Sequence, residues 1–415
     1  MSASYVSRPG NTLPTTCENP PMSQPGQPSK PGDRTPGTDP DAMSDHPAPP
    51  PWQALTPDLS VDRPPRLGAR RIVLSVLSLL LVIALLAWAL PWAAGTTWTQ
   101  IIDSLRGLPL WAVPAMLLLG AGAIALEAWT VRTAVPGSRY GTALQGHAAS
   151  SALALAVPGG GMLGMGLLGW VLRRTGLGLS VVIAGILTAS LIETVVTTVL
   201  VPLVGGIAYV LAGMISVARI DLPAAALWAA LAAVAGGVIA LGLFVVLLRR
   251  PVLTGLLETA AAVTGMGGTD KDSPGGTTSF VPFVLEQRDA LVRLLRERPL
   301  SLVAPTAAAR MLQWLALVLA IEAVGGSVPL LLTVAIFALG RVLSLVPLTP
   351  GGAGVSETVG AAALVALGLG SAAAATSMLL LAVATLVVPL VAGGLAAVLS
   401  VSRGSVTQAQ SASSS

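Results

Sequence analysis

Long apolar runs separated by short charged stretches fill most of this chain, beginning near Ile72 and recurring to Ser400. A helix that crosses a bilayer needs about 20 predominantly apolar residues. The pattern therefore predicts an all-α, polytopic integral membrane protein with about six full spans. We expect these spans at residues 72–92, 108–131, 180–200, 224–248, 301–323 and 374–400.

Two further apolar segments, 142–171 and 329–369, are interrupted near their middle. The first contains Pro158-Gly159-Gly160-Gly161 and the second contains Pro350-Gly351-Gly352. Proline lacks a backbone donor and glycine weakens a helix, so both segments are expected to unwind there. Unwound backbone within a membrane survives only where protein buries it or where it lines a polar cavity. We predict two re-entrant hairpins, and such a pair of breaks is typical of a transporter's binding site.

The arginines between the apolar runs predict the orientation of the spans. Four of them precede the first span, and others flank the first broken segment or follow the fourth and sixth spans: Arg63, Arg66, Arg70, Arg71, Arg139, Arg173, Arg174, Arg249, Arg250 and Arg403. Cytoplasmic loops are enriched in Lys and Arg. Both termini are therefore expected in the cytoplasm. The first hairpin would then enter from the cytoplasm and the second from outside, which is an inverted-repeat-like arrangement.

The apolar run from 177 to 248 is the hardest to divide. Pro202 and the glycines Gly205 and Gly206 interrupt it, and a polar stretch follows at 219–223. With Arg174 and Arg249 both inside, an even number of crossings must lie between them. We assign two spans, 180–200 and 224–248, and expect residues 204–215 to lie shallow at the outer surface.

Composition excludes several classes of protein. Of the 415 residues, 53% are hydrophobic and 10% are charged, and the mean hydropathy is +0.79. Soluble domains carry about 25% charged residues. Nucleic-acid binding would be indicated by a dense basic face interleaved with aromatic residues, and the sequence has no such pattern. The single cysteine, Cys17, excludes an intramolecular disulfide and a multi-cysteine metal site. Neither a metal nor another cofactor is expected.

The charged and proline-rich stretches divide the chain into a membrane domain and two tails. Residues 1–66 hold sixteen of the 32 prolines and are predicted to be a disordered cytoplasmic tail. The transmembrane domain is expected at 67–402, followed by a second disordered tail at 403–415. Within that domain, the segment 249–299 has seven Lys/Arg and six Asp/Glu. We predict a cytoplasmic loop there, with an amphipathic helix at the inner membrane surface.

Seven ionisable side chains fall within the apolar runs, where a charge costs about 2.5–3.5 kcal/mol to insert: Glu127, His147, Glu193, Arg310, Glu322, Arg341 and Glu357. We interpret Glu127 and Glu322 as reaching an interface from the span ends. His147 is interpreted as a hydrogen-bond donor between helices and not as a metal ligand. Two alternatives stay open for Arg310 and Arg341, namely internal ion pairs and contacts to a ligand phosphate.

Each break also exposes the N-terminus of the half-helix that follows, where free N–H groups favour an anion. Glu357 stands in the second such half-helix. It either caps free amides or takes up a proton or a cationic headgroup. The candidate substrate-binding residues are Pro158, Gly159, Gly160, Gly161, Gly164, Arg173, Arg174, Arg310, Arg341, Pro350, Gly351, Gly352, Gly354 and Glu357.

The run Pro347-Leu348-Thr349-Pro350-Gly351-Gly352-Ala353-Gly354-Val355-Ser356-Glu357 resembles the signature of the lysylphosphatidylglycerol synthase transmembrane region, also called the flippase-like family. Residues 158–177 are similar to that family's other conserved element. The resemblance covers roughly 72–400. It implies movement of a phospholipid or lipid-linked headgroup between leaflets. The Ala/Gly-rich, lysine-poor composition of the membrane region suggests a bacterium, so we expect the protein in a bacterial inner membrane. Family members that lysylate lipid carry an aminoacyl-transferase domain after the spans, and this sequence shows none.

We therefore expect a flippase-like translocase without catalytic activity, whose partners are membrane lipids and no nucleic acid. A different reading is a membrane scaffold or accessory subunit of a cell-envelope glycosyltransferase or lipid-modifying system, which would give it an enzyme partner. A third is a proton-coupled permease for a small anion. A lipid substrate requires a cavity that opens sideways to the bilayer, whereas a permease requires one that opens only to water.

Overall fold

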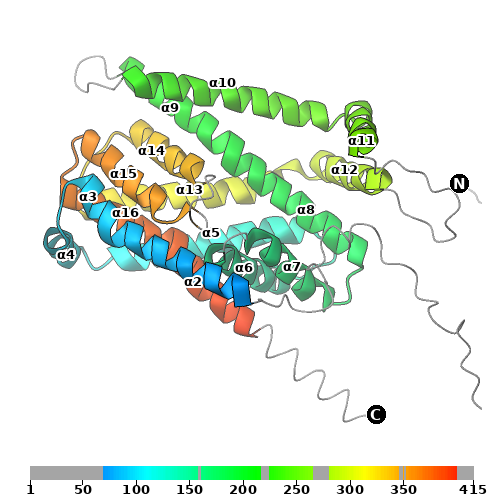
Figure 1. The fold of residues 1–415 in the computed structure, drawn as a ribbon, viewed down its shortest axis with the longest axis horizontal. Coiled ribbons are helices and arrows are strands. Elements are labelled where there is room, and N and C mark those ends of the chain that lie inside the picture. Colours follow the sequence, from blue (N-terminus) through cyan, green and yellow to red (C-terminus); the bar gives the residue numbers. More distant parts are fainter. Residues whose placement is uncertain are drawn as a thin grey trace, which may run out of the picture. The chain divides into compact units, whose positions relative to one another are not determined.

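A computed structural model describes residues 69–157, 160–215, 224–264, 280–344, 349 and 352–399. Every regular element in these segments is a helix (Figure 1), which confirms the predicted all-α fold. The first elements are α2 (Ala69–Ala84), the π-helical turn η1 (Leu85–Ala89), α3 (Leu90–Ala94), α4 (Trp98–Arg106), α5 (Ala112–Ala134), α6 (Tyr140–Ala156), α7 (Gly160–Arg173), α8 (Leu179–Val195) and the π-helical turn η2 (Val196–Leu200). They are followed by α9 (Val201–Ile215), α10 (Ala224–Leu247), α11 (Arg250–Thr264), α12 (Phe280–Glu297), α13 (Pro299–Ala323), α14 (Leu330–Leu343), α15 (Val355–Ala366), α16 (Ser371–Ala382) and the π-helical turn η4 (Val383–Val387).

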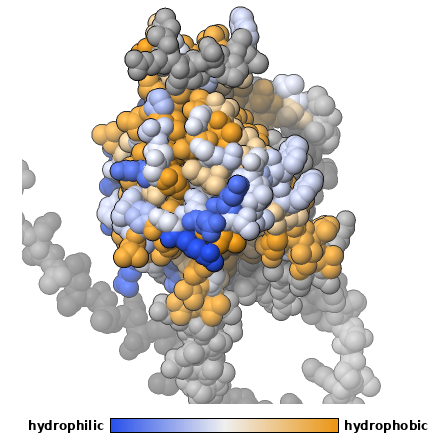
Figure 2. Space-filling model, turned by 90° about the vertical axis from the view of Figure 1, so that its left-hand side faces the viewer, coloured by the Kyte–Doolittle hydropathy of each residue, from blue (hydrophilic) through white to orange (hydrophobic). Residues whose placement is uncertain are grey.

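Six helical stretches in this part of the chain are long and apolar enough to cross a membrane, in agreement with the predicted number. They are Val73–Ala94, Ala112–Ala134, Leu179–Ile215, Ala226–Leu247, Pro299–Ala323 and Ser371–Leu399. Large apolar side chains cover their outer faces, as expected for helices in contact with lipid. Figure 2 looks onto the end of the bundle at which α4 lies, where hydrophilic residues gather between hydrophobic surfaces. The exposed pair Asp103–Arg106 belongs to α4.

The two broken segments form helical hairpins, α6–α7 and α14–α15. Their four helices have 17, 14, 14 and 12 residues. At about 1.5 Å per residue they are about 18 to 26 Å long, shorter than the roughly 30 Å hydrocarbon core. None is long enough to cross a bilayer alone, as the sequence predicted. The predicted break residues Pro158, Gly159, Pro350 and Gly351 lie outside the described residues.

The two hairpins open at opposite ends of the bundle. Ala112, at the start of α5, shares an apolar cluster with Val328 and Leu369, which flank the α14–α15 hairpin. Ala134, at the other end of α5, shares a second cluster with Leu177, which follows the α6–α7 hairpin. The opposed arrangement predicted from the arginines is therefore present within the bundle. Which end faces the cytoplasm stays a prediction.

The predicted interruption at residues 202–206 is wrong, whereas the depth of residues 204–215 in a membrane stays a prediction. Helices α8, η2 and α9 form one continuous stretch, Leu179–Ile215. Pro202 is accommodated by the wide turn η2, in which Val201 N–H bonds to Val196 O. Gly205 permits close contact with α14, since an added Cβ would lie 2.1 Å from Ala338 Cβ. The glycines that indicated a break thus serve helix packing.

Each of the three π-helical turns in the described segments is followed by a proline, two residues beyond its end: η1 by Pro91, η2 by Pro202 and η4 by Pro389. Because proline has no backbone N–H, the carbonyl four residues before it receives no helical hydrogen bond. For Pro91 that carbonyl is Ala87 O, which accepts a hydrogen bond from Trp98 Nε1 at 2.6 Å. Wide turns and side-chain donors therefore let these helices continue through proline.

The predicted amphipathic helix in the charged loop is α12. Its buried residue Leu291 and its neighbours Leu294 and Leu295 face the bundle, the latter two in the cluster that contains Leu302. Arg288 on the same helix donates to Leu248 O at the end of α10. The apolar face of α12 is thus partly covered by the membrane domain itself.

Candidate functional site

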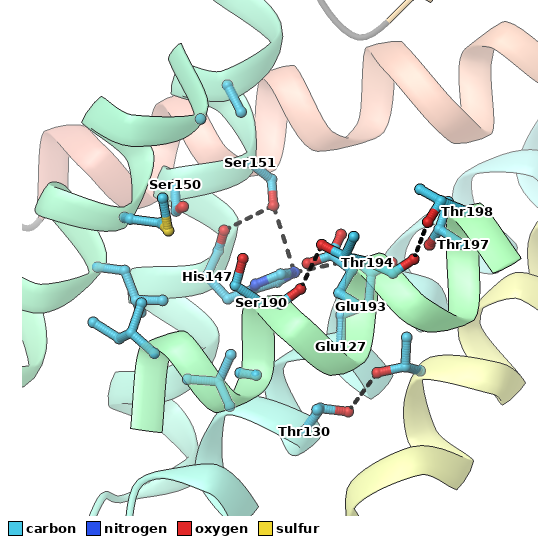
Figure 3. A pocket seen from close by; sticks show the side chains of 18 residues that line it. Glu127, Thr130, His147, Ser150, Ser151, Ser190, Glu193, Thr194, Thr197 and Thr198 are labelled. Carbon is cyan, nitrogen blue, oxygen red and sulfur yellow. Dashed lines mark hydrogen bonds and ion pairs between the residues drawn. The ribbon is translucent and has the colours of Figure 1, made fainter. Parts of the chain in front are cut away.

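A cavity of about 340 Å³ lies among α5, α6, α7, α8 and α13, and is called the main cavity below. Figure 3 shows that side chains from α6 and α8 face one another across it. Its wall combines the ionisable residues Glu127, His147 and Glu193 with hydroxyl groups of Thr130, Ser150, Ser151, Ser190, Thr194, Thr197, Thr198 and Thr306. Such a concentration of polar groups is costly inside an apolar bundle unless they are bonded or bind something.

Arg310 of α13 is the centre of a polar network beside this cavity. Its Nη1 lies 2.9 Å from Glu127 Oε1, and its Nη2 lies 3.2 Å from Glu193 Oε1. Its Nε donates to Thr197 Oγ1 at 2.9 Å. Of the two alternatives for Arg310, the structure shows internal ion pairs. Four elements, α5, α8, η2 and α13, are joined by one guanidinium group.

Glu127 does not reach an interface, so that interpretation is wrong. The residue is only 9% exposed, because α5 turns it toward the other helices. Its second carboxylate oxygen, Oε2, lies 3.0 Å from His147 Nε2 on α6, which agrees with the predicted inter-helix role of His147. Glu322, by contrast, is exposed near the end of α13, as predicted.

Gln313 connects Arg310 to Arg341 of α14. Its Oε1 accepts hydrogen bonds from Arg310 Nη1 at 2.8 Å and from Arg341 Nη2 at 2.5 Å. The Arg341 guanidinium also lies 5.1 Å from the ring centre of Phe337. Among the described residues, no carboxylate lies within ion-pair distance of Arg341. The bonds shown for this arginine are therefore to neutral groups.

Gln313 forms a bridge between Arg310 and Arg341, and a second cavity of about 70 Å³, called the small cavity, lies on the Arg341 side of this bridge. Arg341, Ser344, Ser356 and Glu357 line it together with apolar residues. Glu357 is 3% exposed. Its Oε2 accepts Gly354 N–H at 2.6 Å and the Ser356 hydroxyl at 3.0 Å. Gly354 has φ +85°, a conformation that favours glycine. These contacts give Glu357 the capping role that was one of its two predicted roles.

The predicted hairpin glycines have different surroundings. Gly161 is exposed and lines the main cavity. Gly160, Gly164 and Gly352 instead permit close backbone contacts. An added Cβ would lie 2.2 Å from Leu153 O at Gly160, 2.6 Å from Ser150 O at Gly164 and 2.3 Å from Ser344 Cα at Gly352. The structure thus brings one of these four glycines to the main cavity and gives the others a packing role.

Arg173 and Arg174 lie at the opposite end of α7 from Gly161, about 18 Å away along the helix axis. Arg173 Nη1 donates to Leu177 O at 3.0 Å, and Arg174 lies 4.7 Å from the centre of the Trp170 ring. Neither lines the main or the small cavity. The structure therefore does not bring these arginines together with the other candidate residues.

Gln313 and the hydroxyl groups of the main cavity were not among the residues predicted from the sequence. A usable signal existed for the hydroxyls. Ser190, Thr194, Thr197 and Thr198 follow one another at intervals of four, three and one residues within an otherwise apolar span. That spacing places them on one face of a helix. A polar stripe on a membrane helix indicates a face directed at protein or a cavity.

The fold and these two cavities define a multi-pass helical membrane protein with a charged network enclosed by its spans. Residues 75–393 match the model of the lysylphosphatidylglycerol synthase TM region family, and the chain belongs to that family. The matched range contains both hairpins and every residue of the polar network. No curated protein matches the chain.

Proposed function

We propose that this protein moves the headgroup of a phospholipid or lipid-linked molecule between the leaflets of a bacterial cytoplasmic membrane. The main cavity supports this function. Its volume of about 340 Å³ lies at the small end of the roughly 300–1,000 Å³ that is usual for ligand pockets. A headgroup is of that scale, and the acyl chains would remain in the surrounding lipid. Since only the membrane region of the family is matched, we propose a transporter and no catalytic activity.

The observation that carries the proposal is the position of the cavity's opening. Gly161 of α7 and Thr194 of α8 are exposed, and the side chain of Glu193 is 46% exposed. All three line the cavity, so it reaches the surface between α7 and α8. The same surface carries Met162 and Leu187, which are 52% and 42% exposed. An opening bordered by apolar side chains faces lipid, as a lipid substrate requires.

A direct test is to block the opening. Gly161 has open space where a Cβ would be placed, so Gly161→Trp should fold and fill the entrance. Gly236 of α10 is likewise exposed with open space, and Gly236→Trp is the matched control. We expect Gly161→Trp to slow headgroup translocation in proteoliposomes and Gly236→Trp to match the parent protein. If the parent protein moves zwitterionic, anionic and cationic lipids no faster than empty liposomes do, the proposed function is wrong.

A further inference from the structure

The charges of the two cavities and their bridge do not balance. Three carboxylates, those of Glu127, Glu193 and Glu357, accompany two guanidinium groups, those of Arg310 and Arg341. With all five ionised, the network carries one excess negative charge. An uncompensated charge is unfavourable within a membrane. One additional proton would neutralise the network.

His147 is placed to take that proton. Its ring is buried on α6 and lines the main cavity. Its Nε2 lies 3.0 Å from Glu127 Oε2, and Ser151 Oγ lies 3.5 Å from the same nitrogen. A neutral imidazole that donates from Nε2 keeps Nδ1 as an acceptor. The ring can therefore gain a proton at Nδ1 without losing its bond to Glu127.

The charged groups that act on His147 come from three other elements. Glu127 belongs to α5, Glu193 to α8 and Arg310 to α13, and Arg310 contacts both carboxylates. The two acids favour a charged imidazole, whereas Arg310 opposes it. Because Glu193 lies at the open side of the main cavity, a proton can reach the ring through that opening.

We infer that His147 with Glu127 forms a proton-binding site and that headgroup movement is coupled to binding and release of one proton there. The coupling rests on the proposed function, whereas the proton site rests on the geometry alone. When the ring is neutral, Glu127 has one cationic partner, Arg310. When the ring is charged, Glu127 has two, and Arg310 can turn toward Glu193 or an anionic group in the cavity. The proton adds to Nδ1 and leaves from it, and no bond between heavy atoms changes.

The proton site can be observed without any transport assay. The chain has two histidines, His46 and His147, so His46→Asn leaves a single imidazole. NMR of this variant labelled with ¹⁵N-histidine reports which ring nitrogens carry protons. We expect a neutral ring protonated at Nε2 to become doubly protonated as the pH is lowered between about 9 and 5, the range that brackets histidine titration. A ring that stays neutral, or stays charged, throughout would overturn the proton site.

The coupling is tested in proteoliposomes with an imposed pH gradient. A gradient of one pH unit is a tenfold ratio of proton concentrations across the membrane, which is worth about 1.4 kcal/mol per proton moved. We expect the parent protein's translocation rate to change severalfold when the gradient is reversed. His147→Gln keeps an N–H donor for Glu127 but cannot be charged, so its rate should not respond. The control Glu322→Gln, at an exposed position, should respond like the parent.

The outcomes separate the two proposals. If the parent moves no lipid, the proposed function fails, and the NMR titration alone decides on the proton site. If the parent moves lipid equally under both gradients, the coupling is wrong. If His147→Gln still responds to the gradient, the coupling does not involve this histidine, and the assignment is wrong.

Discussion

At the scale of single residues, Arg310 has the most partners in the polar network. Two carboxylates, one hydroxyl and one amide bind its guanidinium group. A buried ion pair adds little net stability, but removal of one partner leaves an unpaired charge that is far more costly. We therefore expect the free energy of unfolding to fall more when one charged member of the network is removed than when both members of an ion pair are replaced by neutral residues.

We predict that Arg310→Leu destabilises the protein by about 3–5 kcal/mol, because Glu127 is left buried without its cationic partner. The double variant Arg310→Leu/Glu127→Gln should recover part of this loss. Thermal unfolding in detergent measures both. Arg106→Leu, at a side chain that is 77% exposed, is the control and should unfold like the parent. An unchanged unfolding temperature for Arg310→Leu would contradict the prediction.

For Glu357 we predict that replacement by glutamine preserves folding and abolishes lipid translocation. A glutamine oxygen can still accept from Gly354 N–H, but the negative charge is gone. Glu357→Ala should instead lower the unfolding temperature, since it leaves that buried N–H unbonded at a cost of about 1–3 kcal/mol. A leaflet assay in proteoliposomes measures transport. Parent-like transport by Glu357→Gln would mean that the carboxylate only caps the helix.

At the scale of helices, glycine has two roles that the sequence does not distinguish. Pro-Gly-Gly indicated both hairpins correctly, and the same residue types at Pro202, Gly205 and Gly206 indicated a break that does not exist. Whether glycine ends a helix or permits a close contact depends on what lies opposite. At Gly205 that is Ala338, more than a hundred residues away in the chain.

The close contact predicts that Gly205→Leu is destabilising. The added side chain would overlap α14 at Ala338, and overpacking typically costs about 1–3 kcal/mol. Gly236→Leu is the matched control, since Gly236 of α10 has open space at its Cβ. Thermal unfolding should show a lower midpoint for the first variant and no change for the second. Equal unfolding midpoints for the two variants would contradict the prediction, because they would show that α9 and α14 can move apart without a loss of stability.

The opposed hairpins predict that their flanks label from opposite sides of the membrane. Gly178 and Gly370 are a matched pair, because each caps the helix after a hairpin, has negative φ and has open space at its Cβ. With Cys17 replaced by serine, we expect Gly178→Cys to react with an impermeant thiol reagent only from the cytoplasmic side. Gly370→Cys should react only from outside. Labelling of both from one side would refute the predicted membrane topology.

The sequence predicts the elements of this protein better than their contacts. Spans and hairpins follow from apolar length and from proline and glycine, which act locally. The polar network does not follow from local sequence features, because the pairing of Glu127, His147 and Arg310 depends on how three helices are rotated about their axes. Glu127 was misread for this reason. Its distance from the span end is a local property, whereas its burial is not.

At the scale of the whole molecule, the matched family range begins at residue 75. The proline-rich composition of residues 1–66 offers little apolar surface for burial. We therefore predict that deletion of residues 2–60 leaves expression and the unfolding temperature of the membrane domain unchanged. Comparison of the truncated and full-length proteins in the same detergent measures this. A clearly lower unfolding temperature would mean that the tail docks on the membrane domain.

The π turn Val196–Leu200, which supplies Thr197 and Thr198 to the main cavity, has a consequence for comparing related sequences. Its hydrogen bonds span five residues instead of four, so the turn holds one residue more than a regular helix would. A relative with a regular helix would reach the same later positions with one residue fewer, so pairing the two sequences without a gap offsets every later side chain on this span by about 100°. Alignments across this helix should therefore allow a one-residue gap at the turn. Without it, residues that face the cavity in one protein would be paired with residues that face lipid in another.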